Sequence, residues 1–331
     1  MGAFSRLGND LYSGKRSIDF VGRRWLWYAV SAVIVAVAVF GLASKGLNMG
    51  IEFTGGAEYR VTLPTDRVTQ ETADELRESV AATGVESASS PVVTTSGTEA
   101  IIVQTEPVDD AESEQIVATI LDTTGAGAAD ISQTEIGPSW GREVAERSLL
   151  GLAVFLVLVV LFIWAYFREW KMSVSALVAL GHDVLITVGV YALSGFEVSP
   201  ATVTGVLTIL GFSLYDTVVV FDKVRENTHE LKNTRLSYAE AANLAVNQTL
   251  VRSINTSVVA VLPVASILFI GAFLLGAGTL RDLSLALFVG IIVSALSTLF
   301  IQAPLYSVLR AGEPEVKKHR DKVLAARSVA V

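Results

Sequence analysis

Residues 201–221 read ATVTGVLTILGFSLYDTVVVF, an apolar run that contains one carboxylate, Asp216. A membrane-spanning helix needs about 20 mostly apolar residues, and this run is long enough. A carboxylate in the middle of such a helix costs roughly 2.5–3.5 kcal/mol on insertion scales, so it normally faces other protein and binds a proton or an ion. We therefore predict a membrane span here, with a proton or ion site at Asp216.

Apolar residues also dominate the rest of the chain. Of its 331 residues, 51% are hydrophobic and 18% are charged, and the mean hydropathy is +0.52. These values are too apolar for an ordinary soluble protein. The absence of cysteine excludes disulfides, cysteine-bound zinc and thiol nucleophiles. Six stretches have the length and composition of membrane spans: Trp25–Ala43, Ser148–Phe167, Ser173–Ser194, Ala201–Phe221, Ile254–Leu275 and Leu283–Leu305.

The distribution of Lys and Arg predicts the orientation in the membrane. Basic residues precede the first span, follow the second and fourth spans, and recur in the tail, whereas the short loops on the other side contain only Arg281. The positive-inside rule then puts both termini in the cytoplasm. The predicted organisation is a cytoplasmic segment at 1–24, an uncleaved first span at 25–43, an extracytoplasmic domain at 44–147, a five-helix bundle at 148–305 and a basic cytoplasmic tail at 306–331.

The extracytoplasmic domain is strongly acidic, with 19 acidic and 5 basic residues between positions 44 and 146. Its periodicity predicts strands at Ala57–Leu63, Ser87–Thr94, Ala100–Thr105 and Ala129–Ile136, and helices at Val68–Ala82 and Ala111–Asp122. This βαββαβ order favours a ferredoxin-like α+β domain. Its acidity fits either a solvated face or a surface that attracts basic substrate segments, and both interpretations stay open.

Three ionisable residues lie in or beside consecutive spans. Asp183 is near the middle of the third span, Asp216 is in the cytoplasmic part of the fourth, and Arg252 is at the start of the fifth. Antiparallel packing brings Asp216 and Arg252 to a similar depth, so we predict that they pair and that all three residues form a proton relay. Structural roles stay open: hydroxyl groups or Arg252 could satisfy Asp216, Arg252 could snorkel, and Asp183 could bond within the bundle.

Helical geometry predicts which neighbours these residues have. His182 is rotated by about 100° from Asp183, so we expect no direct contact between them. Gly205 is rotated by only about 20° from Asp216, which predicts a shared face on which another helix can approach closely. Between the fourth and fifth spans, Asn227–Asn247 is predicted to form a short amphipathic helix at the membrane surface.

Four motifs, taken together and in this order, resemble the SecF family. They are NMGIEFTGG at Asn48–Gly56, Gly181-His182-Asp183, TILGFSLYDTVVVFDKVREN at Thr208–Asn227, and NQTLVRSINTS at Asn247–Ser257. The resemblance covers nearly the whole chain. The family-motif residues outside the three ionisable positions are Gly50, Glu52, Phe53, Gly55, Gly56, Asn247, Gln248 and Thr249. The chain departs from many relatives at Tyr215, where they have Asn, and at Glu52, where they often have Asp. The Gly55-Gly56 pair is expected to use positive φ angles in a tight exit from helix to domain.

The resemblance to SecF implies half of an RND-type transporter in the bacterial cytoplasmic membrane. Its expected partners are SecD, the SecYEG channel, YajC, a translocating preprotein and the lipid bilayer, with no nucleic acid and no cofactor. Proton flow is expected to help draw secreted chains outward. Asp216 matches the proton-responsive aspartate of the family, and Arg252 matches its essential basic residue. H⁺ is the expected coupling ion.

Two other function classes compete with this interpretation. An RND-type proton-coupled exporter of small molecules or lipids would share the proton site, but such exporters usually have twelve spans and two large outer domains in one chain. A non-motor assembly factor of the translocation channel would need no intramembrane acid. An enzyme is not expected, because the sequence contains no nucleotide-binding loop, metal-ligand cluster or nucleophilic triad.

Overall fold

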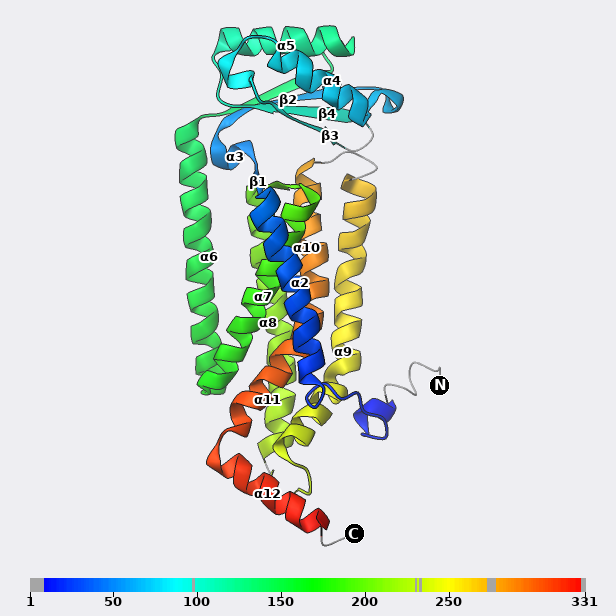
Figure 1. The fold of residues 1–331 in the computed structure, drawn as a ribbon, viewed down its shortest axis with the longest axis vertical. Helices are drawn as coiled ribbons and strands as arrows, with labels where there is room; N and C mark the ends of the chain where they lie inside the picture. The colour runs from blue at the N-terminus through cyan, green and yellow to red at the C-terminus, as the bar shows by residue number, and fades with distance from the viewer. Residues whose placement is uncertain (1–8, 97–98, 230, 232–233, 273–277, 329–331) are drawn as a thin grey trace.

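Six long helices form a bundle, and a small domain of helices and strands lies beyond one end of it (Figure 1). The computed structural model describes residues 9–96, 99–229, 231, 234–272 and 278–328. Within these residues, six helices are long and apolar enough to cross a membrane, which confirms the six predicted spans. The predicted end of the fifth span at Leu275, residues 1–8 of the first segment and residues 329–331 of the tail lie outside the described residues.

Each bundle helix begins before its predicted span, and the first and fourth helices also continue beyond it. The bundle helices are α2 (Arg24–Lys45), α6 (Pro138–Phe167), α7 (Trp170–Ser194), α8 (Pro200–His229), α9 (Tyr238–Ser266) and α10 (Gly278–Ser297). A π-helical segment at Ile267–Ala272 continues α9, and another at Thr298–Gln302 joins α10 to α11 (Ala303–Ala311). Helix α12 (Pro314–Ser328) follows and lies across the end of the bundle farthest from the small domain (Figure 1).

The predicted separate helix at Asn227–Asn247 is wrong. Helix α8 continues to His229, and α9 already begins at Tyr238. A capping box fixes this start: the Ser237 hydroxyl accepts from the Glu240 backbone N–H, and the Glu240 carboxylate accepts from the Ser237 N–H at 2.8 Å. Residues 227–229 therefore belong to the end of α8, and residues 238–247 belong to the first turns of α9.

The small domain has the predicted βαββαβ order. Its elements are β2 (Gly56–Thr62), α4 (Gln70–Ala81), β3 (Val92–Ser96), β4 (Ala100–Thr105), α5 (Asp110–Thr124) and β5 (Ile131–Ile136). The strands form one antiparallel sheet in the order β3-β4-β2-β5. Ala57, Tyr59 and Val61 alternate along β2 and are fully buried in the domain core. The predicted strand at Ser87–Thr94 begins only at Val92, because residues 86–88 form a 3-10 turn.

A short connection ties this domain to the bundle. Helix α2 leads into β1 (Asn48–Met49), which pairs in parallel with β6 (Glu197–Val198) in the loop between α7 and α8. Helix α3 (Ile51–Thr54) then ends at Gly55, with φ of 75°, and Gly56 starts β2 with φ of 145°. The expected positive φ angles are confirmed, and they allow the sharp exit that a residue with a Cβ would strain. The domain is thus joined to the loop between the helices that carry Asp183 and Asp216.

Candidate ion-coupling site

The aspartate of α8 lies on the buried side of its helix, and only 3% of Asp216 is exposed. Gly205 is buried on the same helix, and a Cβ added there would lie 2.8 Å from the Cβ of Ala286 on α10. The expected close approach of a neighbouring helix at Gly205 is therefore confirmed. Glycine lets α8 and α10 pack closely on the face of α8 that also carries Asp216.

The direct partner of Asp216 is a hydroxyl group and not a guanidinium group. Ser253 Oγ on α9 donates a hydrogen bond of 2.6 Å to Asp216 Oδ1. Arg252 is exposed, and its Nη2 donates at 3.1 Å to the hydroxyl of Tyr215, the residue before Asp216. The predicted direct contact between Asp216 and Arg252 is not formed, because adjacent residues on α9 point in directions about 100° apart; Arg252 acts on Asp216 only through its charge. The residue that follows Arg252 faces the carboxylate.

The second carboxylate, Asp183 on α7, is 1% exposed. Ser213 Oγ on α8 donates to Asp183 Oδ2 at 3.0 Å, and His182 Nδ1 lies 3.3 Å from Asp183 Oδ1. The expectation that His182 would not contact Asp183 is therefore wrong: the flexible side chains meet although their Cα–Cβ bonds diverge. Ser213 is three residues before Asp216, so a single face of α8 contacts Asp183 and carries Asp216.

Polar residues on the last membrane-spanning helix complete the site, and they were not among the site residues predicted from the sequence. Thr217 Oγ1 donates to Gln302 Oε1 at 3.0 Å. Gln302 lies in the π-helical segment Thr298–Gln302, a geometry often found at functional sites. The sequence did contain a signal for these residues, because Ser294, Thr298 and Gln302 are spaced four residues apart within an apolar run. We call the following residues the intramembrane polar cluster: Asp183, Ser213, Asp216, Thr217, Ser253, Ser294, Ser297, Thr298 and Gln302, all at most 1% exposed except Asp216.

Several atoms of the intramembrane polar cluster can still bind a proton or water. Asp216 Oδ2, Gln302 Nε2, Ser294 Oγ and Thr298 Oγ1 are buried and have no hydrogen-bond partner among the described residues. Buried polar atoms without partners are costly, so such atoms normally bind water, an ion or another polar group. Over the described part of the chain, no group of three or more His, Asp or Glu side chains could hold a metal ion. The unpartnered Asp216 Oδ2 gives the intramembrane polar cluster a carboxylate oxygen that can take up a proton.

A polar face of α8 and α9 points out of the bundle. Tyr215 is 51% exposed, Arg252 and Asn255 are exposed, and Thr208 lies on the same side of α8 as Tyr215. A Cβ added at Gly211 would meet nothing within 4 Å. A charged side chain in contact with lipid is expensive. This outward polar face is therefore a costly surface to leave against lipid.

The remaining motif residues lie outside the intramembrane polar cluster. Gly50, Glu52, Phe53, Gly55 and Gly56 form the connection to the small domain. A Cβ added at Gly141 of α6 would lie 2.8 Å from Gly55 N, so α6 packs tightly against this connection.

The second motif group anchors the N-terminal segment to α9. The side chain of Asn247 accepts from Ile18 N at 2.8 Å and donates to Ile18 O at 2.9 Å. Gln248 Nε2 donates to Tyr12 O at 3.2 Å. Thr249 Oγ1 donates within α9 to Ala245 O at 3.0 Å. These contacts give the second group a structural role.

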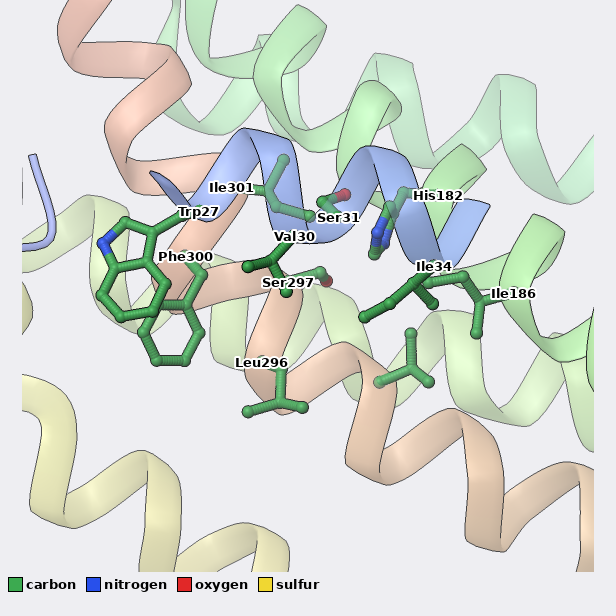
Figure 2. Close-up of a pocket in the computed structure, with 11 residues that line it drawn as sticks. Trp27, Val30, Ser31, Ile34, His182, Ile186, Leu296, Ser297, Phe300 and Ile301 are labelled. Carbon is green, nitrogen blue, oxygen red and sulfur yellow. The ribbon is translucent and has the colours of Figure 1, made fainter. Parts of the chain in front are cut away.

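An apolar pocket of about 270 Å³ lies between α2, α7 and the end of α10 (Figure 2). Its lining includes Trp27, Ile34 and Phe300, and His182 contributes one of the few polar side chains. His182 Nε2 has no hydrogen-bond partner among the described residues, while Nδ1 faces Asp183. The pocket thus brings an apolar surface next to the polar site.

Comparison with known proteins agrees with this architecture. The family model for the C-terminal region of the protein export membrane proteins SecD and SecF matches residues 116–312, and the SecD/SecF GG motif matches residues 40–63. The protein translocase subunit SecF of Streptomyces coelicolor is 46% identical over 331 residues, covering 99% of this chain and 86% of that protein. The protein translocase subunit SecDF of Thermus thermophilus is 33% identical over 291 residues, covering 87% of this chain and 38% of that protein.

A solved structure has the same fold. The crystal structure of SecDF, a translocon-associated membrane protein from Thermus thermophilus, matches with a TM-score of 0.78 and 30% sequence identity. The match covers 89% of this chain and 39% of that chain. This chain therefore spans about two fifths of the SecDF chain, in which additional sequence is fused to the part that resembles it.

Proposed function

This chain belongs to the SecD/SecF family of protein export membrane proteins, and we propose that it uses the proton motive force to promote export of preproteins across the bacterial cytoplasmic membrane. Its role in Sec protein translocation follows from its membership of the family. The proton-driven part of the proposal rests mainly on one observation: Asp216 is buried within a span, bonded by Ser253 at one oxygen and without a partner among the described residues at the other.

Protonation of Asp216 provides a physical route from ion movement to helix movement. A proton on Asp216 removes a buried charge and weakens the bond from Ser253, because hydrogen bonds to ionised groups are the stronger ones. Helices α8 and α9 then prefer a different relative position. Asp183 on α7 accepts a hydrogen bond from Ser213 of α8, so a movement of α8 also acts on α7.

The small domain is positioned to follow a movement of α7 and α8. Strand β6 joins α7 to α8 and pairs with β1, which leads into the domain. A shift of α7 and α8 therefore acts on the domain through this pair of strands. One proton crossing 100 mV releases about 2.3 kcal/mol, which changes a two-state ratio by roughly 50-fold. This amount biases one movement, so export of a long chain takes many cycles.

The outward polar face of α8 and α9 supports SecD as the membrane partner. Arg252 and Tyr215 would face lipid in the isolated chain, and a second set of spans would cover them. The fused SecDF relative supports this pairing. SecYEG, YajC and the translocating preprotein are the further partners we propose, with both termini in the cytoplasm.

We assign the small domain to the extracytoplasmic side as a ferredoxin-like domain. Its βαββαβ order and its sheet order β3-β4-β2-β5 support the fold. Its net charge of −14 between positions 44 and 146 suits either a solvated surface or transient contact with basic preprotein segments. The domain would act by position and contact, and we assign no catalytic role to the chain.

Depletion of this chain tests the proposed function. In inverted membrane vesicles, we expect the completion of preprotein export to fall several-fold and to stop responding to an imposed proton gradient, while an imposed Na⁺ gradient has no effect. Re-expression of the chain restores the response. Normal gradient-dependent export after depletion, with a loss of small-molecule efflux, would instead support an exporter. A loss of the translocation channel itself would support an assembly factor.

A further inference from the structure

A hydrogen bond links the small domain directly to the loop between α7 and α8. Gln104 on β4 is 8% exposed, and its Nε2 donates to Glu197 Oε1 at 2.8 Å and to Glu58 Oε2 at 3.1 Å. Beside it, Gly50 N–H donates to Val198 O at 3.0 Å. Glu197 is therefore the side chain through which the α7–α8 loop holds the domain sheet.

Acidic groups from every neighbouring element crowd Glu197. Glu52 approaches from α3, Glu58 from β2 and Asp282 from α10, and all three act on Glu197 electrostatically. Arg281, the residue before Asp282, has its Nε 3.5 Å from Asp282 Oδ1 and its guanidinium 5.4 Å from the ring of Phe196. Arg281 is thus engaged with Asp282 and the ring.

The backbone at Gly50 allows two of these carboxylates to come close. A Cβ added at Gly50 would overlap an oxygen of Glu52 and would lie 2.7 Å from Glu197 Oε1. Glu52 Oε2 is buried and accepts no hydrogen bond among the described residues. Two carboxylates this close together repel each other when both are ionised, and this repulsion favours a proton on one of them.

These surroundings change the pKa of Glu197, which lies outside the membrane-spanning segments. Burial is the largest cause of its raised pKa, which is about 7. The hydrogen bond from Gln104 is the second-largest cause and lowers the pKa, and the charges of Glu58, Glu52 and Asp282 each raise it by less. Glu197 therefore changes charge near neutral pH while it contacts the domain.

We propose that Glu197 is a proton-sensitive latch that holds the outer domain on the α7–α8 loop. Protonated Glu197 still accepts from Gln104 through its carbonyl oxygen and no longer repels Glu52, Glu58 and Asp282. Ionised Glu197 keeps the hydrogen bond but meets three like charges. The latch goes beyond the proposed function, because it responds to pH on the domain side of the membrane and does not require proton transfer at Asp216.

The sign of the pH effect follows from the direction of the shift. The docked state has a pKa of about 7 at Glu197, and an undocked, solvated Glu has the ordinary value of 4.5. The docked state therefore binds more protons and is favoured at low pH. This advantage is fully present below about pH 4.5 and is lost as the pH rises to about 7. Within this window, the ratio of docked to undocked domain falls by up to roughly tenfold per pH unit.

Distance measurements between spin labels test the latch. The chain has no cysteine, so the changes Ser132→Cys on β5 and Ser194→Cys at the end of α7 give a single labelled pair at exposed positions. In the full chain in lipid nanodiscs, we expect a narrow distance distribution at pH 5 that broadens by pH 8. The Glu197→Gln variant keeps an acceptor for Gln104 but cannot titrate, so its distribution stays narrow at both pH values.

Two further variants separate the latch from general effects of charge. Glu114→Gln removes an exposed acid of α5 and should retain the wild-type pH response. Gln104→Ala removes the bridging donor and should give a broad distribution already at pH 5. A wild-type distribution that is the same at pH 5 and pH 8, or the same pH response in Glu197→Gln, would overturn the proposal. The distance distribution depends neither on export nor on Asp216, so a failure of the latch is distinguishable from a failure of the proposed function.

Discussion

Replacement of Asp216 by Asn is expected to abolish the part of preprotein export that depends on the proton gradient. The Asn side chain has nearly the same shape, and its carbonyl oxygen can still accept from Ser253 Oγ. It cannot ionise at any physiological pH. The bundle should therefore assemble normally while the ion-dependent change between α8 and α9 is lost. The measurement is export completion in inverted vesicles with and without an imposed proton gradient, together with the amount of chain in the membrane.

A matched control lies on the same helix. Asp222 is six residues further along α8 and is exposed, so Asp222→Asn makes the same chemical change outside the intramembrane polar cluster. We expect this variant to export as the wild type does. If Asp216→Asn showed a normal gradient response, Asp216 would have only a structural role, and if both variants failed equally, the effect would belong to α8 as a whole.

Replacement of Gly189 by Ala is expected to lower the free energy of unfolding by about 1–3 kcal/mol, the usual cost of overpacking. Gly189 lies on α7 where α2 crosses it, and an added Cβ would overlap the Cβ of Ala38. The two helices must then separate along their contact. The measurement is thermal unfolding of the purified chain in detergent, where the midpoint should fall.

Gly181→Ala provides the comparison, because an added Cβ at Gly181 on the same helix meets nothing within 4 Å. Alanine favours helix over glycine by up to about 1 kcal/mol, so this variant should unfold at the same or a slightly higher temperature. Equal unfolding of both variants would contradict the close packing of α2 on α7 and leave only the helix preference of alanine.

The fold was predictable to the extent that it follows from periodicity. Long apolar runs such as 201–221 must be helices in a membrane, because all of their backbone groups need internal hydrogen bonds. The alternation of Ala57, Tyr59 and Val61 identified a strand, because every second side chain of a strand points to the same face and here packs into the domain core. The late start of β3 at Val92 was not predictable, because the 3-10 turn before it leaves no periodic signal.

The site was predictable in its residue types but not in its contacts. The cost of burying charge was enough to select Asp183 and Asp216, and whether they carry protons stays a prediction. The choice between Arg252 and Ser253 as the partner of Asp216 depends on a rotation of one residue along α9. Gln302 reaches Thr217 from a π-helical segment, whose extra residue per turn no regular helical pattern anticipates.

The most direct test of the central claim is proton movement through the reconstituted protein. The chain and its co-purified SecD partner would be placed in liposomes that contain a pH-sensitive dye. A membrane potential, negative inside, would then be applied to drive protons inward. Wild-type liposomes should acidify, Asp222→Asn should acidify at the same rate, and Asp216→Asn should show only the leak of empty liposomes. Acidification by Asp216→Asn at the wild-type rate would contradict the assignment of Asp216 as the proton-coupling residue.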